Sequence, residues 1–377
     1  MLKEILEQYQ IPSVLTMNNG EVCNTEEMWQ KRRKEILELF SSEVYGYMPP
    51  APDHVTFTVK GCWKKQIMGK ATIKRIEATF TTPSGPFTFP FYYYEPDTDH
   101  TVPAIVFLQF AQHPVYCSFP IETIIDNGFA VAVVDYENIQ ADRYDFAQGL
   151  AGMYITGESP WDDLSADTYA KNRKRGSTQW GFIGAWAFAA SRIMDYLQTQ
   201  DHIDKKRIAV MGHSRLGKTA MWCAANDERF RLAVISASGC SGASLSKMKD
   251  ETCEKIEQIT EVFPYWFSRR WPAYAGHEKE MTFDQHWILS AIAPRSFYLC
   301  SGSDDSWAGP KTEYLCAVAA NEVYHMLGQE GLKHPDRMPM AGDIFDEGTA
   351  AYSMHKGTHY LGEFEWNNVM EYMKKLK

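Results

Sequence analysis

The segment 211–218, Met-Gly-His-Ser-Arg-Leu-Gly-Lys, restricts the possible folds of this chain more than any other segment. It follows a short apolar strand at 207–210 and precedes an apolar helix that we expect to begin near Thr219. A strand, a tight turn and a helix in this order form a nucleophile elbow, in which a serine hydroxyl stands on a strained corner below the helix N-terminus. The sequence therefore predicts Ser214 as a nucleophile, with backbone N–H groups of the turn facing any oxyanion that forms.

The segment departs from the common Gly-x-Ser-x-Gly spacing. Leu216 stands at the expected position of the second glycine, and the glycine follows one residue later as Gly217. Most serines in a bare Gly-x-Ser turn have no chemistry, so a purely structural turn is the alternative interpretation. The flanking strand and helix favour the catalytic interpretation.

The rest of the pattern predicts an α/β protein. An amphipathic helix is expected at 26–44 with Thr25 as its cap, followed by an antiparallel meander at about 54–60, 71–80 and 87–94. Wholly apolar strands then alternate with helices, which is typical of a parallel sheet covered on both faces. The predicted parallel strands are 103–110, 129–135, 207–210, 232–236 and 296–301, with a strong helix at 181–197.

Length and composition indicate one large unit. The 377 residues are 45% hydrophobic, and no repeat, linker or charge block divides them, so we expect a single domain over 1–377 with 1–100 as an N-terminal extension. The net charge of −10 opposes binding to nucleic acid or to anionic membranes. Eight cysteines without a C-x-x-C motif predict buried free thiols. The charged N-terminus indicates a soluble chain, either cytoplasmic or secreted with its leader removed.

A serine nucleophile requires a base and an acid that orients the base. In the order serine, acid, histidine, the acid follows a late strand, here 296–301, which favours Asp305 with Asp304 as its competitor. The base belongs in a loop before the last helix, and His359 occupies such a loop before a helix expected near Glu363.

The other histidines receive no catalytic role. His355 lies four residues before His359, but Gly357 opposes a helical metal pair and no nearby glutamate completes a zinc motif, so neither metal nor cofactor is expected. His213 is expected on the turn, pointing away from the site. His286 is expected to serve packing or capping at the start of a helix.

Several segments together resemble the signature segments of the glucuronoyl esterases of carbohydrate esterase family 15. They are 212–218, 238–246, 263–267, 284–286, 293–295, 305–308 and 357–359. The N-terminal segments 29–33 and 43–46 fit the bacterial members. The resemblance spans nearly the whole chain in the right order, and it is more specific than the elbow alone.

This resemblance implies a three-layer αβα sandwich of the α/β-hydrolase fold, with the N-terminal helical and antiparallel extension. It implies cleavage of esters between 4-O-methyl-glucuronic acid on xylan and lignin alcohols, with Ser214 as nucleophile, His359 as base and Arg215 as a cationic donor at the oxyanion. Lys218, Glu254 and Trp307 fall where the family contacts the sugar. Lys218 follows Ser214 by one turn, and its alternative is a solvated helix residue. Glu254 is expected in a charged helix, where a solvated face is the alternative.

Three departures from the family pattern affect the substrate. Some members carry their acid just before the 238–246 segment, where this chain has Ala237, which assigns the orienting role to Asp305. Ser241 replaces a glycine common in that segment, and the loop 109–114 lacks the usual glycine and asparagine.

The sequence thus predicts a metal-independent serine carboxylesterase that acts on uronate esters as a monomer. The alternatives are an esterase for acetylated xylan or methyl uronates, and a catalytically inactive hydrolase fold that binds glycans. A general lipase is disfavoured, because the sequence contains no long apolar segment that could form a lid.

Overall fold

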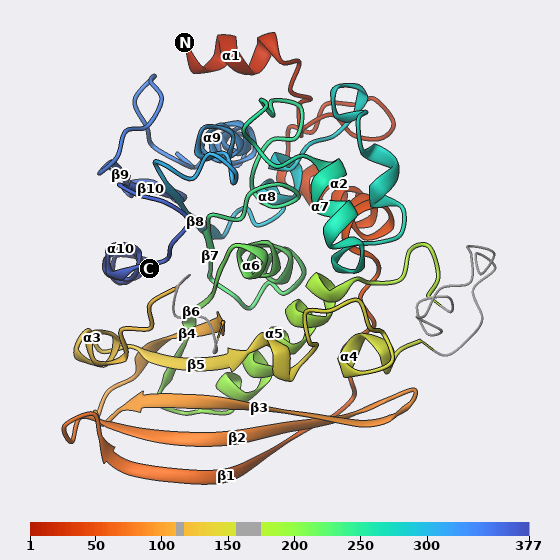
Figure 1. The fold of residues 1–377 in the computed structure, drawn as a ribbon. Coiled ribbons are helices and arrows are strands. Elements are labelled where there is room, and N and C mark those ends of the chain that lie inside the picture. The colour runs from red at the N-terminus through yellow and green to blue at the C-terminus, as the bar shows by residue number, and fades with distance from the viewer. Residues whose placement is uncertain (111–116, 156–174, 377) are drawn as a thin grey trace.

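A ten-stranded sheet organises the part of the chain that the structure, a computed structural model, describes: residues 1–110, 117–155 and 175–376. Its strand order is β1-β2-β3-β5-β4-β6-β7-β8-β10-β9. Figure 1 shows the sheet running from the long β1–β3 strands at one edge to β9 at the other.

The antiparallel edge is longer than the sequence predicts. β1 (Val55–Gln66), β2 (Ala71–Thr82) and β3 (Gly85–Pro96) have twelve residues each, and β3 also pairs antiparallel with β5. Alternate residues of β3 are buried, as expected for a strand with one face on the core. The buried aromatic side chains are Phe89, Phe91 and Tyr93.

The remaining strands form the parallel part, with β9 antiparallel at the far edge. They are β4 (Val102–Gln109), β5 (Ala130–Asp135), β6 (Ile203–His213), β7 (Leu232–Ser236), β8 (Ser296–Gly302), β9 (Ile344–Phe345) and β10 (Ala351–His355). Most residues of β4, β5, β7 and β8 are buried, because helices cover both faces of a parallel sheet.

Helices form the two outer layers. Figure 1 shows α3 (Ile121–Asp126) and α10 (Glu363–Lys375) on one face, and α5 (Phe182–Gln198) and α6 (Arg215–Asn226) on the other. The further helices are α1 (Leu2–Gln8), α2 (Glu26–Phe40), α4 (Gly149–Gly152), α7 (Ile256–Val262), α8 (His286–Ser290) and α9 (Pro310–Met326). The predicted α/β-hydrolase sandwich of three layers is confirmed, and each of its predicted strands is present.

The helix predictions hold with corrections. Thr25 caps α2 as predicted, with its hydroxyl accepting from the Met28 N–H at 3.2 Å, but the last residues of the expected helix form a π turn at Ser41–Tyr45. The helix expected from Thr219 begins at Arg215, because the Ser214 carbonyl already accepts hydrogen bonds from the next turn. Strand β10 and helix α9 were not predicted.

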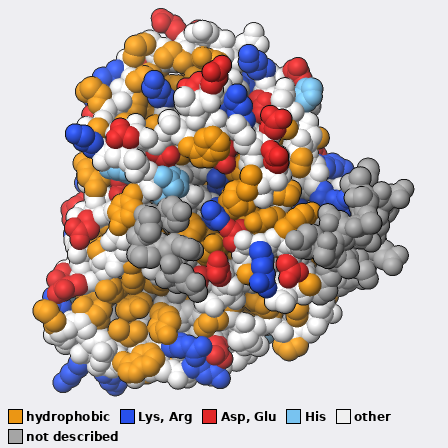
Figure 2. Space-filling view, viewed as in Figure 1, with side chains coloured by type: hydrophobic (Ala, Val, Ile, Leu, Met, Phe, Trp, Pro, Cys, Tyr) orange, Lys and Arg blue, Asp and Glu red, His pale blue; other side chains and the backbone are white. Residues whose placement is uncertain are grey.

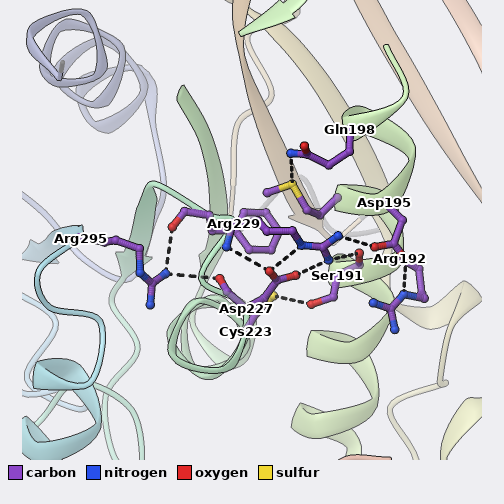
Figure 3. A network of polar contacts seen from close by, with 10 residues as sticks. Ser191, Arg192, Asp195, Gln198, Cys223, Asp227, Arg229 and Arg295 are labelled. Atoms are coloured by element: carbon purple, nitrogen blue, oxygen red, sulfur yellow. Dashed lines mark hydrogen bonds and ion pairs between the residues drawn. The ribbon is translucent and has the colours of Figure 1, made fainter. Parts of the chain in front are cut away.

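A polar network joins α5 to α6 at the end of α6 that lies opposite Ser214 (Figure 3). The Arg229 guanidinium donates to Asp227 and to Asp195, at 2.7 Å in each case, and Arg192 donates to Asp195 at 2.6 Å. Although burial opposes ionisation of Asp227, its contacts with Arg229 hold the pKa of that carboxyl below its usual value. The network ties the C-terminal end of α6 to α5.

Two further expectations concern the thiols and the helices. All eight cysteines lie in the described residues and are free thiols, and each except Cys62 is buried. Within the described ranges, no helix combines the length and the apolar character that crossing a membrane requires.

Candidate active site

Ser214 lies at the strained corner that the elbow predicts. Its backbone has φ 58° and ψ −126°, a conformation that residues other than glycine rarely adopt. A Cβ atom at Gly212 would lie 2.0 Å from the Leu216 carbonyl oxygen, so only glycine fits two residues before the serine. A Cβ atom at Gly217 would lie 2.9 Å from the Ser236 carbonyl oxygen of β7. This contact explains the displaced second glycine, because α6 approaches β7 at position 217.

The structure brings Asp305, rather than Asp304, to His359. The His359 Nδ1 atom lies 2.6 Å from Asp305 Oδ2, and the other carboxylate oxygen accepts from the Ala308 N–H at 3.2 Å. Asp305 is buried, whereas Asp304 is exposed and accepts from the neighbouring Ser303 hydroxyl at 3.0 Å. A buried carboxylate on Nδ1 leaves Nε2 of the imidazole as the atom that can accept a proton.

The expectation that His213 points away from the site is wrong. Its ring centroid lies 4.4 Å from that of His359, and its Nδ1 atom lies 3.1 Å from the Ser236 hydroxyl. Burial, with the nearby His359, lowers the pKa of His213 well below its usual value, so the ring is neutral. Because His213 directly precedes Ser214, this contact packs the base loop against the nucleophile elbow.

Arg215 opens α6 and is fixed by an acid and an aromatic face. Its guanidinium forms an ion pair with Asp142 and lies 4.6 Å from the ring centroid of Trp266. The Trp266 indole N–H donates to the other Asp142 oxygen at 2.6 Å, and Phe263 stacks on the indole with centroids 3.9 Å apart. Sequence reasoning missed Asp142, because it lies in a loop without a motif, 73 residues from Arg215.

Lys218 is not a solvated helix residue. Its side chain is almost fully buried, and its ammonium donates to the Ser238 carbonyl oxygen at 2.5 Å and lies 5.9 Å from the Trp266 ring centroid. Burial lowers the pKa of Lys218, and the nearby Glu254 carboxylate opposes that shift. The ammonium therefore lies in a polar site with an aromatic wall.

Glu254 lies in the turn before α7, and not in a charged helix as the sequence analysis expected. The helix begins at Ile256 because the Gln258 side chain caps the Lys255 N–H at 2.7 Å. The Glu254 N–H donates to the Trp307 carbonyl oxygen at 2.9 Å, so these two candidate residues are neighbours. The Trp307 side chain is half exposed and lies at the surface.

Glu313 is a buried carboxyl that the sequence does not reveal. Glu313 of α9 accepts from the Gly239 N–H at 2.9 Å and from the Ser301 hydroxyl at 2.7 Å. Burial raises the pKa of Glu313 to about 7. Its contacts join the chain after β7 to β8, and the segment after β7 supplies the Ser238 carbonyl that binds Lys218.

The departures from the family pattern have local explanations. Ala237 directly follows β7, and its N–H donates to the Cys300 carbonyl of β8 at 2.7 Å, so position 237 lies beside the strand that precedes Asp305. Ser241 keeps a φ of 55°, a value typical of the glycine that it replaces, and its hydroxyl accepts from Trp271 at 2.8 Å. Of the loop 109–114, residues 111–114 lie outside the described residues.

The remaining expectations concern His286 and metal binding. His286 is buried at the start of α8, where its Nε2 atom lies 2.8 Å from the Pro12 carbonyl oxygen. No group of three or more His, Cys, Asp or Glu side chains in the described ranges could hold a metal ion. On the face shown in Figure 2, histidine and charged side chains lie close together near the centre, among hydrophobic ones.

The sequence is similar to known carbohydrate esterases. A family model described as glucuronyl esterase of fungi matches residues 164–328. A carbohydrate esterase from an unknown prokaryotic organism is 30% identical over 390 residues, covering 97% of this chain and 89% of the relative. A 4-O-methyl-glucuronoyl methylesterase from Phanerochaete carnosa is 26% identical over 327 residues, covering 84% of this chain and 72% of the relative.

The structure is similar to solved esterases over the same extent. A glucuronoyl esterase from Solibacter usitatus superposes with a TM-score of 0.81 at 30% identity, covering 97% of each chain. An esterase of carbohydrate esterase family 15 from a marine bacterial metagenome, described as promiscuous, gives a TM-score of 0.82 at 28% identity, covering 97% of this chain and 96% of the other. With this site and these relatives, the chain belongs to the glucuronoyl esterases of carbohydrate esterase family 15 and is a carboxylic ester hydrolase.

Proposed function

We propose that the protein is a metal-independent serine esterase that hydrolyses esters of glucuronic acid, including the 4-O-methyl-glucuronate esters that join glucuronoxylan to lignin alcohols. The observation that carries this proposal is the His359–Asp305 pair, which packs through His213 against the elbow that presents Ser214. The fungal relatives are named 4-O-methyl-glucuronoyl methylesterases, which supports glucuronate as the acyl group of the substrate.

The proposed chemistry uses these groups in sequence. Ser214 attacks the ester carbonyl while His359 takes its proton, and Asp305 holds the imidazole in the tautomer that accepts this proton. The N-terminus of α6 and the Arg215 guanidinium stabilise the oxyanion. His359 then returns the proton to the leaving alcohol, and water, activated by the same base, releases glucuronate from Ser214.

The sugar site that we propose consists of two charged groups and one indole. Lys218 and Glu254 bind ring hydroxyls, because a dehydrated ammonium and a carboxylate form strong hydrogen bonds with such groups. Trp307 offers an exposed indole face on which a sugar ring can pack. The buried state of Lys218 supports this role, since a solvated lysine would be more flexible.

A second candidate is a wider or different carbohydrate esterase activity, on acetylated xylan or on methyl uronates. The family member from the marine metagenome, described as promiscuous, supports this candidate. We further propose a monomer that acts without nucleic acid or a membrane, and the net charge of −10 supports the exclusion of nucleic acid.

The proposal is tested by the rates of hydrolysis of benzyl glucuronate, methyl galacturonate, acetylated xylan and 4-nitrophenyl acetate. We expect the largest kcat/KM for benzyl glucuronate, and a kcat at least about 10³-fold lower for the Ser214→Ala variant on each ester. A preference for acetylated xylan over benzyl glucuronate would move the assignment to the second candidate.

A further inference from the structure

A second histidine, His355, lies at the junction of the two loops that carry the proposed acid and the proposed base. It is the last residue of β10 and pairs in register with Gly302, the last residue of β8. Its Nδ1 atom lies 2.6 Å from Glu365 Oε1 of α10, and its Nε2 atom lies 2.9 Å from the Thr358 carbonyl oxygen. Thr358 directly precedes His359, so His355 contacts the backbone that positions the base.

Both partners of the His355 ring are hydrogen-bond acceptors. A backbone carbonyl cannot donate, and the second oxygen of Glu365 already accepts from the Gly362 N–H at 2.8 Å. With Glu365 ionised, the two contacts are satisfied together only if both ring nitrogens carry a proton, which makes the ring an imidazolium. In agreement, the Glu365 contact raises the pKa of His355 above its usual value, although burial opposes this shift.

The same residue lies where the two loops are joined. The Ser303 N–H donates to the His355 carbonyl at 3.0 Å, and the Asp304 N–H donates to the Gly357 carbonyl at 2.8 Å. A Cβ atom at Gly302 would lie 2.9 Å from His355 Nε2 and 2.5 Å from the Thr358 oxygen, so the ring and the loop lie directly over this glycine. Displacement of the ring would therefore shift the loop of His359 relative to that of Asp305.

We propose that His355, as an imidazolium paired with Glu365, is a positioning residue that binds the Thr358 carbonyl and holds His359 in its productive place. This role rests on the proposed function of His359. When His355 loses a proton, the charge-assisted contact with Glu365 persists, because it is the stronger of the two. The Nε2 lone pair then faces the Thr358 oxygen, the contact is lost, and turnover falls.

The charges around the ring favour this form. Among the described residues, the ionisable groups that interact with it are Glu365 of α10, Asp305 of the loop after β8 and His213 of β6, and His359 follows on its own loop. Both carboxylates stabilise the imidazolium, and His213 is neutral. The Cys300 thiol of β8 interacts with Glu365, but burial raises the pKa of this thiol well above its usual value, so it is neutral as well. The imidazolium is present below the raised pKa of His355 and is lost as the pH rises through it.

The test measures kcat and KM against pH for benzyl glucuronate and 4-nitrophenyl acetate. We expect His355→Gln to lower kcat by about 10- to 100-fold with little change in KM, because a shift of about 1 Å in a catalytic group has an effect of this size. We expect the wild-type kcat to fall on the alkaline side with the pKa of His355, as determined by NMR titration of its ring.

Glu365→Gln gives the sharper result. The introduced amide can donate to Nδ1 of a neutral ring, which leaves the Nε2 proton for the Thr358 carbonyl and retains the Gly362 contact. We therefore expect this variant to keep its kcat at alkaline pH, where the wild type loses activity. A merely structural role would not remove this alkaline limb.

The matched control is His277→Gln, which breaks an exposed histidine–glutamate pair of 2.7 Å with Glu280 and should leave both pH profiles unchanged. Thermal unfolding of each variant separates lost activity from lost folding. An alkaline limb that is identical in the wild type and in Glu365→Gln would overturn the proposal, and so would a neutral His355 ring at a pH of full activity. Turnover of the acetate alone would refute the glucuronate assignment while still testing His355.

Discussion

Replacement of Asp305 by asparagine tests the proposed acid, because the structure determines which way the new amide would turn. One carboxylate oxygen accepts from the Ala308 N–H and the other faces His359 Nδ1. If the amide oxygen stays on Ala308, the amide N–H group points at Nδ1. His359 must then carry its proton on Nε2, where it cannot accept the proton of Ser214.

The size of the effect follows from these contacts. The opposite orientation of the amide places two donors against each other at Ala308, which costs about 1–3 kcal/mol. The charge-assisted bond that stabilises the imidazolium is lost in either orientation, at about 1.5–3 kcal/mol. We therefore expect Asp305→Asn to lower kcat by about 10²- to 10⁴-fold with a small change in KM.

The assay is the steady-state hydrolysis of benzyl glucuronate, with Asp304→Asn as the matched control. Asp304 is exposed, and its side chain contacts only the neighbouring Ser303 among the described hydrogen bonds, so the control should retain nearly full activity. A loss of less than tenfold for Asp305→Asn, or a larger loss for Asp304→Asn, would refute this assignment of the acid.

Four further outcomes are expected. Ser214→Ala should reduce kcat by at least about 10³-fold, and near-normal turnover of a folded variant would exclude Ser214 from the mechanism. Lys218→Ala should lower kcat/KM for benzyl glucuronate by a factor that corresponds to about 1–3 kcal/mol of transition-state stabilisation, and should barely change kcat/KM for 4-nitrophenyl acetate. Equal losses on both esters would indicate a role in folding or at the oxyanion. Asp142→Asn should lower kcat on both esters, because it weakens the ion pair that positions Arg215, and a change in KM alone would contradict this reasoning. Since burial raises the pKa of Glu313 to about 7 from 4.5, wild-type stability should fall relative to Glu313→Gln as the pH rises from 4.5 to 7, by up to about 3 kcal/mol in urea unfolding, and parallel pH curves would contradict this.

The parts of the fold that the sequence predicts are those with a strong local pattern. Buried parallel strands such as β4 and β7 are continuous apolar runs, and the elbow has a strand and a helix on either side. Strand β10 escapes prediction because its five residues include Ser353 and His355, whose burial depends on neighbours far away in the sequence. The start of α6 is misplaced because the expectation followed the apolar residues, whereas the helix begins with polar Arg215.

The candidate site divides in the same way. The elbow predicts Ser214, the strand 296–301 predicts Asp305 and the loop before the last helix predicts His359, and the structure adds the contact between the last two. Asp142 could not be predicted, because its ion pair with Arg215 depends on the packing of two loops around Trp266. The contacts of His355 also escape, since they require the register between β10 and β8 and the placement of α10.

The pairing of β7 with β8 has a consequence for how such esterases diverge. Because the strands are parallel neighbours, with Ser236 opposite Cys300, the residues that follow them emerge side by side at one edge of the sheet. An acid at position 237 and an acid at position 305 would therefore start from the same edge of the sheet. Neighbouring parallel strands thus offer two starting points for the acid that orients the base, and the choice between them depends on which loop carries the carboxylate.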